Sequence, residues 1–476
     1  MRINYLPFYL IIIALFIGII ATALFSDGMF MDGVLYAAIS NNLANNLGSF
    51  WDIHLTNTLY PHFHEHPPLA FGIQSLFFSL FGESILIERF YSLITFLITG
   101  WIIIRIWKKI SDSKFQNLAW LPLLFWILIP LVTWSAANNM LENTMMIFTS
   151  LSVLFILKSL DSKRLIFLSL SGIMLFLGFL TKGPVALFPI SLPFWIFIFN
   201  RKINFKRFII DTIFLSVATV IPLLIIYIIT PESIDSLIAY FNKQIVGSIE
   251  NIQTVNSRFY ILWRLLNELI PAYILVLITF IFFKRNKVDN IKTKWVLVFF
   301  TLGLSGVIPI IVSMKQSGFY ILATFPFFSI AIAAIVAPRV LQLTNRIDTQ
   351  NKGYKIFKII SYLLLVGSII FATMQIKRIG RDKDKINDVY SIIKIVPKKS
   401  TISVQENLWS DWSLHGYFQR HSFISLDPNM QSAHKYFLIN KGTENELLKD
   451  YKKVAVDLEL FDLYEKQEPP IEEANY

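Results

Sequence analysis

The sequence predicts an α-helical membrane protein: a polytopic bundle of transmembrane helices, followed by a small α/β domain. Apolar residues make up 55% of the 476 residues and aromatic residues 15%, which is far above the usual content of soluble domains. Runs with few charges, long enough to cross a bilayer core of about 30 Å, recur up to residue 374. Charged residues become frequent after that point. Because backbone groups in lipid must pair internally, the spans are predicted to be helices.

The apolar runs divide into roughly eleven spans. In chain order they cover residues 7–25, 87–104, 118–133, 140–157, 165–180, 184–199, 208–229, 267–283, 295–312, 318–337 and 357–374. The first run is too long for the apolar core of a signal peptide, and no convincing cleavage pattern follows it. It is therefore predicted to be a retained helix.

Positive charge orients these spans. Basic residues gather in every second loop, namely 105–114, 158–164, 201–207, 284–294 and 339–358, with Arg2 on the same side. The positive-inside rule makes these loops and the N-terminus cytoplasmic. The net charge of +11 then reflects topology and does not indicate nucleic acid as a partner. We expect a multi-pass protein of the cell membrane.

The opposite face carries the remaining long segments. We predict a transmembrane domain over 1–374, with a first outer loop over 26–86, and an extracytoplasmic α/β domain over 375–476 with short strand-like runs. The chain has no cysteine, which removes disulfides, thiolate catalysis and cysteine-ligated zinc. Function is expected on this outer face, where acidic and imidazole side chains concentrate.

Asp32 is the first candidate for chemistry. It follows the first span and lies immediately before an amphipathic helical pattern, at the N-terminus of the predicted helix. At a helix N-terminus the dipole favours the ionised carboxylate, and an ionised carboxylate beside a lipid surface can act as a general base. The alternative is a structural role for Asp32 as the N-cap of the helix.

A second cluster lies in residues 60–69. His62, His64 and His66 alternate around Glu65, so an extended chain would place the three imidazoles on one side, as a divalent metal requires. Hydrogen-bonded loop histidines are the alternative. Pro68 fits the first turn of a following helix, which is a structural role.

Other charged residues stand at outer helix ends without a topological reason. Glu142 begins the fourth span, Lys182 lies in the turn Thr181–Pro184, and Lys315 precedes Tyr320. Arg89 is a further cation on this side. Cations here are candidates for binding a lipid phosphate, and the alternative is that each one reaches toward lipid headgroups.

In order along the chain, these motifs resemble the C-type polyprenyl-phosphate-dependent glycosyltransferases, close to bacterial relatives of protein O-mannosyltransferases and of the 4-amino-4-deoxy-L-arabinose lipid A transferase. The resemblance covers about residues 7–340. It rests on Asp32 followed by Tyr36-Ala37, on residues 65–69, on residues 88–92, on residues 181–184, and on Lys315 and Tyr320 ahead of Pro326.

The resemblance implies a mechanism and a set of roles. Asp32 corresponds to the catalytic carboxylate and Glu142 to a supporting acid. A sugar would pass, with inversion, from a polyprenyl-phosphate donor to an envelope acceptor that is a lipid, a protein or a polysaccharide. Binding of the lipid phosphate is expected of five residues: His66, Arg89, Lys182, Lys315 and Tyr320. Some relatives bind a divalent metal, for which Glu65 and His64 are the candidate ligands.

Two other functions are compatible with a polytopic chain. A secondary transporter would carry ionisable residues near the middle of its spans and would have related halves, whereas here the acids cluster on one face and no repeat is seen. A noncatalytic lipid-binding assembly protein would not need the outer carboxylates. Loss of activity on removal of the Asp32 carboxylate distinguishes an enzyme from both.

Overall fold

The computed structural model describes residues 4–250, 253–282, 293–432, 434–443 and 446–467. They form two compact units. The first comprises residues 1–25, 64–70 and 89–376, and the second 26–63, 71–88 and 377–476. Most of the predicted first outer loop and the C-terminal residues thus belong to the same compact unit. The domain boundary predicted near residue 374 remains a prediction based on composition.

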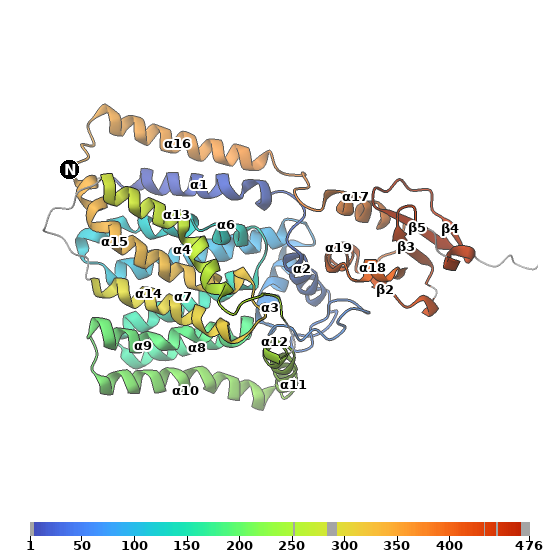
Figure 1. Cartoon of the computed structure of the whole chain (residues 1–476), viewed down its shortest axis with the longest axis horizontal. Helices are drawn as coiled ribbons and strands as arrows, with labels where there is room; N and C mark the ends of the chain where they lie inside the picture. Colours follow the sequence, from blue (N-terminus) through green and yellow to red (C-terminus); the bar gives the residue numbers. More distant parts are fainter. Residues whose placement is uncertain (1–3, 251–252, 283–292, 433, 444–445, 468–476) are drawn as a thin grey trace, which may run out of the picture. The chain divides into compact units, whose positions relative to one another are not determined.

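In the described residues of the first unit, the regular secondary structure is entirely helical (Figure 1). Its α-helices are α1 (Leu6–Leu24), α4 (Ile87–Ile110, counted here from Arg89), α5 (Trp120–Ile127), α6 (Pro130–Ala136), α7 (Leu141–Ser159), α8 (Arg164–Lys182), α9 (Leu192–Trp195), α10 (Phe205–Ile229), α11 (Glu232–Tyr240), α12 (Gly247–Glu250), α13 (Tyr260–Phe282), α14 (Thr293–Val307), α15 (Phe325–Asn345) and α16 (Lys352–Thr373). Its 3-10 and π-helical segments are η1 (Ser113–Leu118), η2 (Gly183–Ser191), η3 (Ile196–Asn200), η4 (Phe241–Val246), η5 (Ile308–Val312) and η6 (Gly318–Thr324).

The predicted membrane architecture is confirmed. Within the described residues, eight helical stretches are long and apolar enough to cross a bilayer, and up to ten if each of two bent helix pairs forms one span. One of the eight, Arg164–Asn200, is 37 residues long and contains the turn predicted at 181–184. It therefore corresponds to two of the predicted spans. The C-terminal end of the span predicted at 267–283 and most of the basic loop 284–294 lie outside the described residues.

Lateral packing holds these helices together. α16 lies beside α1, and α8 lies between α7 and α10 (Figure 1). α10 and α16 keep most of their apolar surface exposed, with 11% of each span buried, whereas 83% of Gly318–Asn345 is buried. Exposed apolar helix faces match a lipid surrounding. α15 is therefore an inner helix of this unit, and α10 and α16 are peripheral.

One predicted span is sharply bent. The span predicted at 118–133 consists of α5 and α6, which meet at 85°. Pro130 starts α6 and leaves the N-terminal backbone groups of α6 without partners from its own helix. The buried Glu268 of α13 accepts a hydrogen bond from the amide of Leu131 at 2.8 Å and pairs with Arg264 at 2.6 Å. A carboxylate thus stabilises a helix N-terminus inside the unit.

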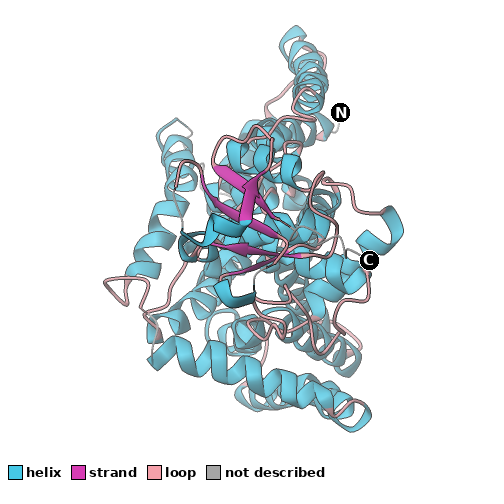
Figure 2. Ribbon diagram, turned by 90° about the vertical axis from the view of Figure 1, so that its right-hand side faces the viewer, coloured by secondary structure: helices cyan, strands magenta, loops and turns pink. Residues whose placement is uncertain are grey.

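The second unit contains a five-stranded sheet, which Figure 2 shows as a single group of arrows. Its strands are β1 (Thr401–Val404), β2 (Ser425–Asp427), β3 (Tyr436–Asn440), β4 (Tyr451–Lys453) and β5 (Phe461–Lys466), in the order β2-β1-β3-β5-β4. β1 is parallel to β2 and β3, and β5 is antiparallel to β3 and β4. Strands and helices alternate, so the predicted α/β character is confirmed.

The helices of the second unit come from both ends of the chain. They are α2 (Met31–Ala44), α3 (Leu69–Phe81, counted here from Phe71), α17 (Lys383–Ile392), α18 (Glu406–Trp409), α19 (Trp412–Ser422), η7 (Met430–Ser432) and η8 (Glu446–Asp450). Met29 and Val34 belong to the same buried apolar cluster as Leu414, Tyr417 and the residues of β1. The outer loop and the C-terminal residues therefore share one hydrophobic core.

Candidate functional site

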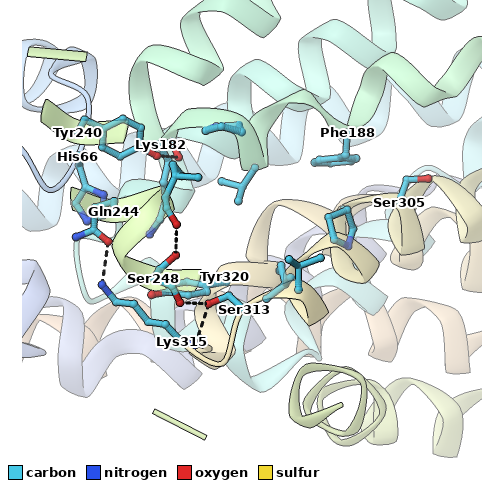
Figure 3. Close-up of a pocket in the computed structure, with 17 residues that line it drawn as sticks. His66, Lys182, Phe188, Tyr240, Gln244, Ser248, Ser305, Ser313, Lys315 and Tyr320 are labelled. Atoms are coloured by element: carbon cyan, nitrogen blue, oxygen red, sulfur yellow. Dashed lines mark hydrogen bonds between the residues drawn. The ribbon is translucent and has the colours of Figure 1, made fainter. Parts of the chain in front are cut away.

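The first unit contains a cavity of about 320 Å³, and most of its labelled polar side chains gather at one end, here called the polar end (Figure 3). The residues that line it are His66, Lys182, Pro184, Val185, Phe188, Tyr240, Gln244, Ile245, Ser248, Ser305, Gly306, Pro309, Ile310, Val312, Ser313, Lys315 and Tyr320. The labelled side chains of the polar end face one another, and Phe188 lies farther along the cavity (Figure 3). The cavity can hold a ligand with a polar head and an apolar continuation.

Lys182 is placed in this cavity by the end of a helix. It is the last residue of α8, and Gly183 follows with a left-handed φ of 75°. A Cβ atom at Gly183 would lie 2.0 Å from the hydroxyl oxygen of Tyr240, so only glycine fits the turn. The hydroxyl of Tyr240 donates a hydrogen bond to the carbonyl of Lys182 at 3.3 Å. The turn and Tyr240 together hold Lys182 in place.

Glu142 is the counter-ion of Lys182. Its side chain is fully buried in the first turn of α7, and it forms an ion pair with the ammonium of Lys182. The same ammonium lies 5.3 Å from the ring centroids of both Phe319 and Tyr320. A buried carboxylate requires a partner, and Lys182 provides it. Glu142 and Lys182, predicted separately, are thus one interacting pair.

Lys315 provides a second cation at the polar end. Its ammonium donates to the side-chain oxygen of Gln244 at 2.9 Å (Figure 3). Its backbone amide donates to the hydroxyl oxygen of Ser313 at 2.9 Å, and that hydroxyl donates to the carbonyl of Ser248 at 2.7 Å. The Lys315 charge therefore has a neutral amide as its acceptor, whereas Lys182 has a carboxylate.

Gln316 fixes the loop that carries Lys315. Its buried side-chain amide donates to the carbonyls of Arg258 and Ser313, each at 2.8 Å, and accepts from the amide of Ile261 at 3.0 Å. These bonds join the loop to the start of α13. The sequence analysis did not identify Gln316 or Tyr240. A glutamine and a tyrosine in short polar stretches carry no sequence signal that separates such roles from ordinary surface positions.

His66 lines the same cavity as the two lysines. Burial lowers the pKa of its imidazole well below 6.5, and the charges of Lys182 and Lys315 lower it further. His66 is therefore neutral at pH 7 and can donate a hydrogen bond to a phosphate through one ring nitrogen without adding a charge.

Arg89 is not among the residues that line this cavity. Its side chain is buried in α4. Neighbouring residues of its motif join helices: the hydroxyl groups of Tyr91 and Thr144 lie 2.6 Å apart, and Ser92 donates to the carbonyl of Ala136 at 2.9 Å. The motif at 88–92 thus contributes to helix packing around α7. The role of Arg89 in binding phosphate stays a prediction.

The structure does not join the candidate metal ligands into a site. Glu65 faces a lysine, with its carboxylate oxygen 3.6 Å from the ammonium of Lys243. His62 pairs with Asp52 at 2.9 Å, and His66 faces the cavity of the lysines. Among the described residues no group of three His, Asp or Glu side chains is arranged to hold a metal ion. Metal binding by Glu65 and His64 therefore stays a prediction, and no chemical step is assigned to a metal.

Asp32 lies in the first turn of α2, as predicted. The N-cap position of this helix is Phe30, with φ −57° and ψ 142°, and it makes no side-chain capping bond. Asp32 is therefore the second residue of the helix, two positions after the N-cap, so the alternative role as the N-cap is wrong. The side chain is partly buried. Its position favours the ionised carboxylate through the helix dipole.

Comparisons with known proteins agree with the predicted class. Residues 65–226 match the family model of dolichyl-phosphate-mannose-protein mannosyltransferases. No curated protein sequence gives a significant match. The fold is similar to that of ArnT from Cupriavidus metallidurans in its apo state, with a TM-score of 0.63, 14% identity, and coverage of 96% of this chain and 97% of that one.

The same protein bound to undecaprenyl phosphate aligns equally well, with a TM-score of 0.63, 15% identity and the same coverage. The archaeal oligosaccharyltransferase AglB from Archaeoglobus fulgidus, in complex with an inhibitory peptide and a dolichol-phosphate, aligns with a TM-score of 0.47 and 12% identity over 92% of this chain and 70% of that one. The ArnT fold extends over nearly the whole chain. The resemblance predicted from the sequence is thus confirmed, by the family match over 65–226 and by the fold.

Proposed function

We propose that this protein is a membrane glycosyltransferase that moves a sugar from a polyprenyl-phosphate donor to an acceptor of the cell envelope on the extracytoplasmic face. The observation that carries the proposal is the cavity of the first unit. Lys182, Lys315 and neutral His66 stand at its polar end, and apolar side chains such as Phe188 and Ile310 line the rest. A phosphate with an isoprenoid tail has this same division of polarity.

The two lysines support the departure of the phosphate. When the bond between the anomeric carbon and the phosphate oxygen breaks, the phosphate gains negative charge, and cations already in place stabilise that charge. Glu142 pairs with Lys182, and the Lys315 ammonium donates to the neutral side-chain oxygen of Gln244. His66 donates a hydrogen bond. No change in protonation of these groups is required at neutral pH.

The acceptor side of the reaction rests on the resemblance. Asp32 is the proposed base: its carboxylate takes the proton of the acceptor hydroxyl or amine as that group attacks the anomeric carbon from the side opposite the phosphate, which inverts the configuration. The carboxylate at the start of α2 is kept ionised by the helix dipole. The lipid donor accounts for the location of the enzyme in the membrane.

The orientation follows from charge. The basic loops are assigned to the cytoplasm by the positive-inside rule, with the N-terminus on the same side and residues after Thr373 outside. The apolar spans support a multi-pass membrane protein. The positive-inside rule adds a prediction of which end faces the cytoplasm.

An experiment with Asp32 tests the enzymatic proposal. The purified protein is reconstituted in vesicles with polyprenyl-phosphate sugars and envelope extract, and transfer is followed by mass spectrometry. Asp32→Asn keeps the size of the side chain and removes the base, so we expect transfer to fall by about 10²-fold or more. Asp52→Asn, in the same outer loop, is the matched control. Normal transfer by Asp32→Asn at equal expression would exclude Asp32 as the base.

A further inference from the structure

Helix α19, near the C-terminus, packs directly on α2, the helix that carries Asp32. Gly416 marks the contact: a Cβ atom at this position would lie 2.8 Å from Cγ1 and 3.5 Å from Cγ2 of Val34. Val34 is two residues after Asp32. A methyl group at 416 fits only if the Val34 side chain or one of the two helices shifts, so α2 and α19 are in close contact.

Polar contacts extend this interface. Gln419 donates to the side-chain oxygen of Asn42 at 2.9 Å, and Asn42 in turn donates to the carbonyls of His54 and Leu55, each at 2.8 Å. All these groups are buried or partly buried. Gln419 of α19 thus contacts Asn42, the residue of α2 that binds the following part of the outer loop.

Arg420 attaches α19 to the end of the same loop. Its guanidinium group, with 1% of the side chain exposed, pairs with buried Glu88 at 2.9 and 3.3 Å. It also donates to the carbonyls of Glu83 and Ser84, at 3.2 and 2.9 Å, and lies 4.7 Å from the centroid of the Phe78 ring. A buried arginine with this many partners holds a single geometry.

We infer that α19 is a positioning element for the transfer reaction: by packing on α2 and binding the turn 83–88, it holds the helix that carries Asp32 in its working orientation. The inference rests on the proposed function, and it assigns the C-terminal residues a part in catalysis rather than in donor binding. Gly416 and Arg420 are positioning residues. The cavity proposed to bind the lipid phosphate belongs to the first unit, and neither Gly416 nor Arg420 lines it.

The first test uses the close contact at Gly416. Gly416→Ala inserts a methyl group against Val34, and displacement of a catalytic group by a fraction of an ångström costs on the order of tenfold in rate. We expect kcat to fall about tenfold with the KM for the lipid donor unchanged. Val34→Ala removes both Cγ atoms, so the double variant should recover most of kcat. An unchanged kcat in Gly416→Ala, or no recovery in the double variant, would overturn the inference.

Arg420 gives an independent test with a matched control. Arg420→Met should lower kcat without changing donor KM, and Arg420→Lys should restore part of it. Lys398→Met removes an exposed ion pair with Glu83, at 3.9 Å, and should leave kcat within about twofold. If Arg420→Met does not fold, the Gly416 series still decides the question. Equal kcat in folded Arg420→Met and Lys398→Met would contradict the inference.

Because the chain has no cysteine, a disulfide can test whether α19 stays on α2 during turnover. Because Cγ1 of Val34 lies 2.8 Å from the Cβ position at 416, we expect the sulfur atoms of the pair Val34→Cys and Gly416→Cys to come within reach of a disulfide. We expect oxidation to cross-link it and the cross-linked enzyme to keep its activity. A pair that does not cross-link, or one inactive until reduced, would overturn the inference. A wild-type protein that transfers no sugar would instead contradict the proposed function, while cross-linking would still report the contact.

Discussion

At the scale of single residues, the two lysines of the cavity differ in their partners. Lys182 is paired with buried Glu142, whereas Lys315 donates to the neutral amide of Gln244. Removing Lys182 leaves an unpaired buried carboxylate, which costs about 3–5 kcal/mol of stability. Removing Lys315 takes a donor from the side-chain oxygen of Gln244, which carries no charge. Substitution of Lys315 should therefore affect ligand binding alone, whereas substitution of Lys182 should also affect the stability of the fold.

We predict that Lys315→Met weakens binding of undecaprenyl phosphate at least tenfold with little change in thermal stability, because a charge-assisted contact to phosphate is lost. Lys182→Met should lower both affinity and melting temperature, and Lys182→Met with Glu142→Gln should recover most of the stability but not the affinity. Binding is measured by intrinsic fluorescence and stability by thermal denaturation in detergent. Equal affinity of Lys315→Met and wild type would remove Lys315 from the site.

At the scale of elements, α6 depends on a residue far away in the sequence. After the 85° bend between α5 and α6, the backbone amide of Leu131 in the first turn of α6 donates to the carboxylate of Glu268 in α13. Arg264, one turn earlier in α13, pairs with the same carboxylate. The contacts of Glu268 with Leu131 and Arg264 therefore give this bend a specific structural cause.

We predict that Glu268→Leu lowers the free energy of unfolding by about 3 kcal/mol, because it leaves the buried amide of Leu131 and the charge of Arg264 without their acceptor. Glu232→Leu, at an exposed position in the first turn of α11, should change stability by less than about 1 kcal/mol. Thermal denaturation of the two purified variants compares them. Similar melting temperatures would show that the Glu268 contacts do not stabilise the bend.

At the scale of the whole molecule, the second unit combines the outer loop with the C-terminal residues, and α19 contributes to it one buried histidine, His415, and one partly buried histidine, His421. Burial lowers the pKa of His415 and of His421 to about 4 each; the charge of Arg420 contributes at His421. In the unfolded chain these rings bind protons near pH 6.5. Between pH 6.5 and 4 the unfolded state therefore binds more protons than the folded state.

The stability of this unit should thus fall as the pH is lowered from 6.5 toward 4, by about 1.4 kcal/mol per pH unit for each histidine. Hydrogen exchange of α19 and β1, measured at pH 7, 6 and 5, checks this. His421→Gln should reduce the slope by roughly half, since glutamine does not titrate. A stability that is constant from pH 7 to 5 would show that the rings do not stay neutral in the folded protein.

The orientation of the whole chain is tested with reporters. Fusions of alkaline phosphatase or green fluorescent protein after residue 350 should show a cytoplasmic end, and fusions after residue 376 an extracytoplasmic one, because the basic loops are held inside. If fusions after residue 376 gave fluorescent protein and inactive phosphatase, the assignment would be reversed. The proposed active face would then lie in the cytoplasm.

Several features could be predicted from local sequence alone. Apolar runs determine the transmembrane spans, because the bilayer sets their length. The glycine of Thr181–Pro184 marks the end of α8, and Asp32 falls in the first helical turn that its pattern indicates. These are consequences of composition and of backbone geometry within a few residues, which the sequence specifies directly.

The partners of those residues could not be predicted in this way. The pairing of Glu142 with Lys182, of Glu65 with Lys243, and of α2 with α19 joins positions separated by tens to hundreds of residues. His66 is neutral because two distant lysines and burial lower its pKa. The helical membrane architecture and the candidate residues for chemistry could thus be predicted from the sequence. Which of them meet, and with what charge, depends on tertiary packing, because electrostatic and van der Waals contacts act through space and not along the chain.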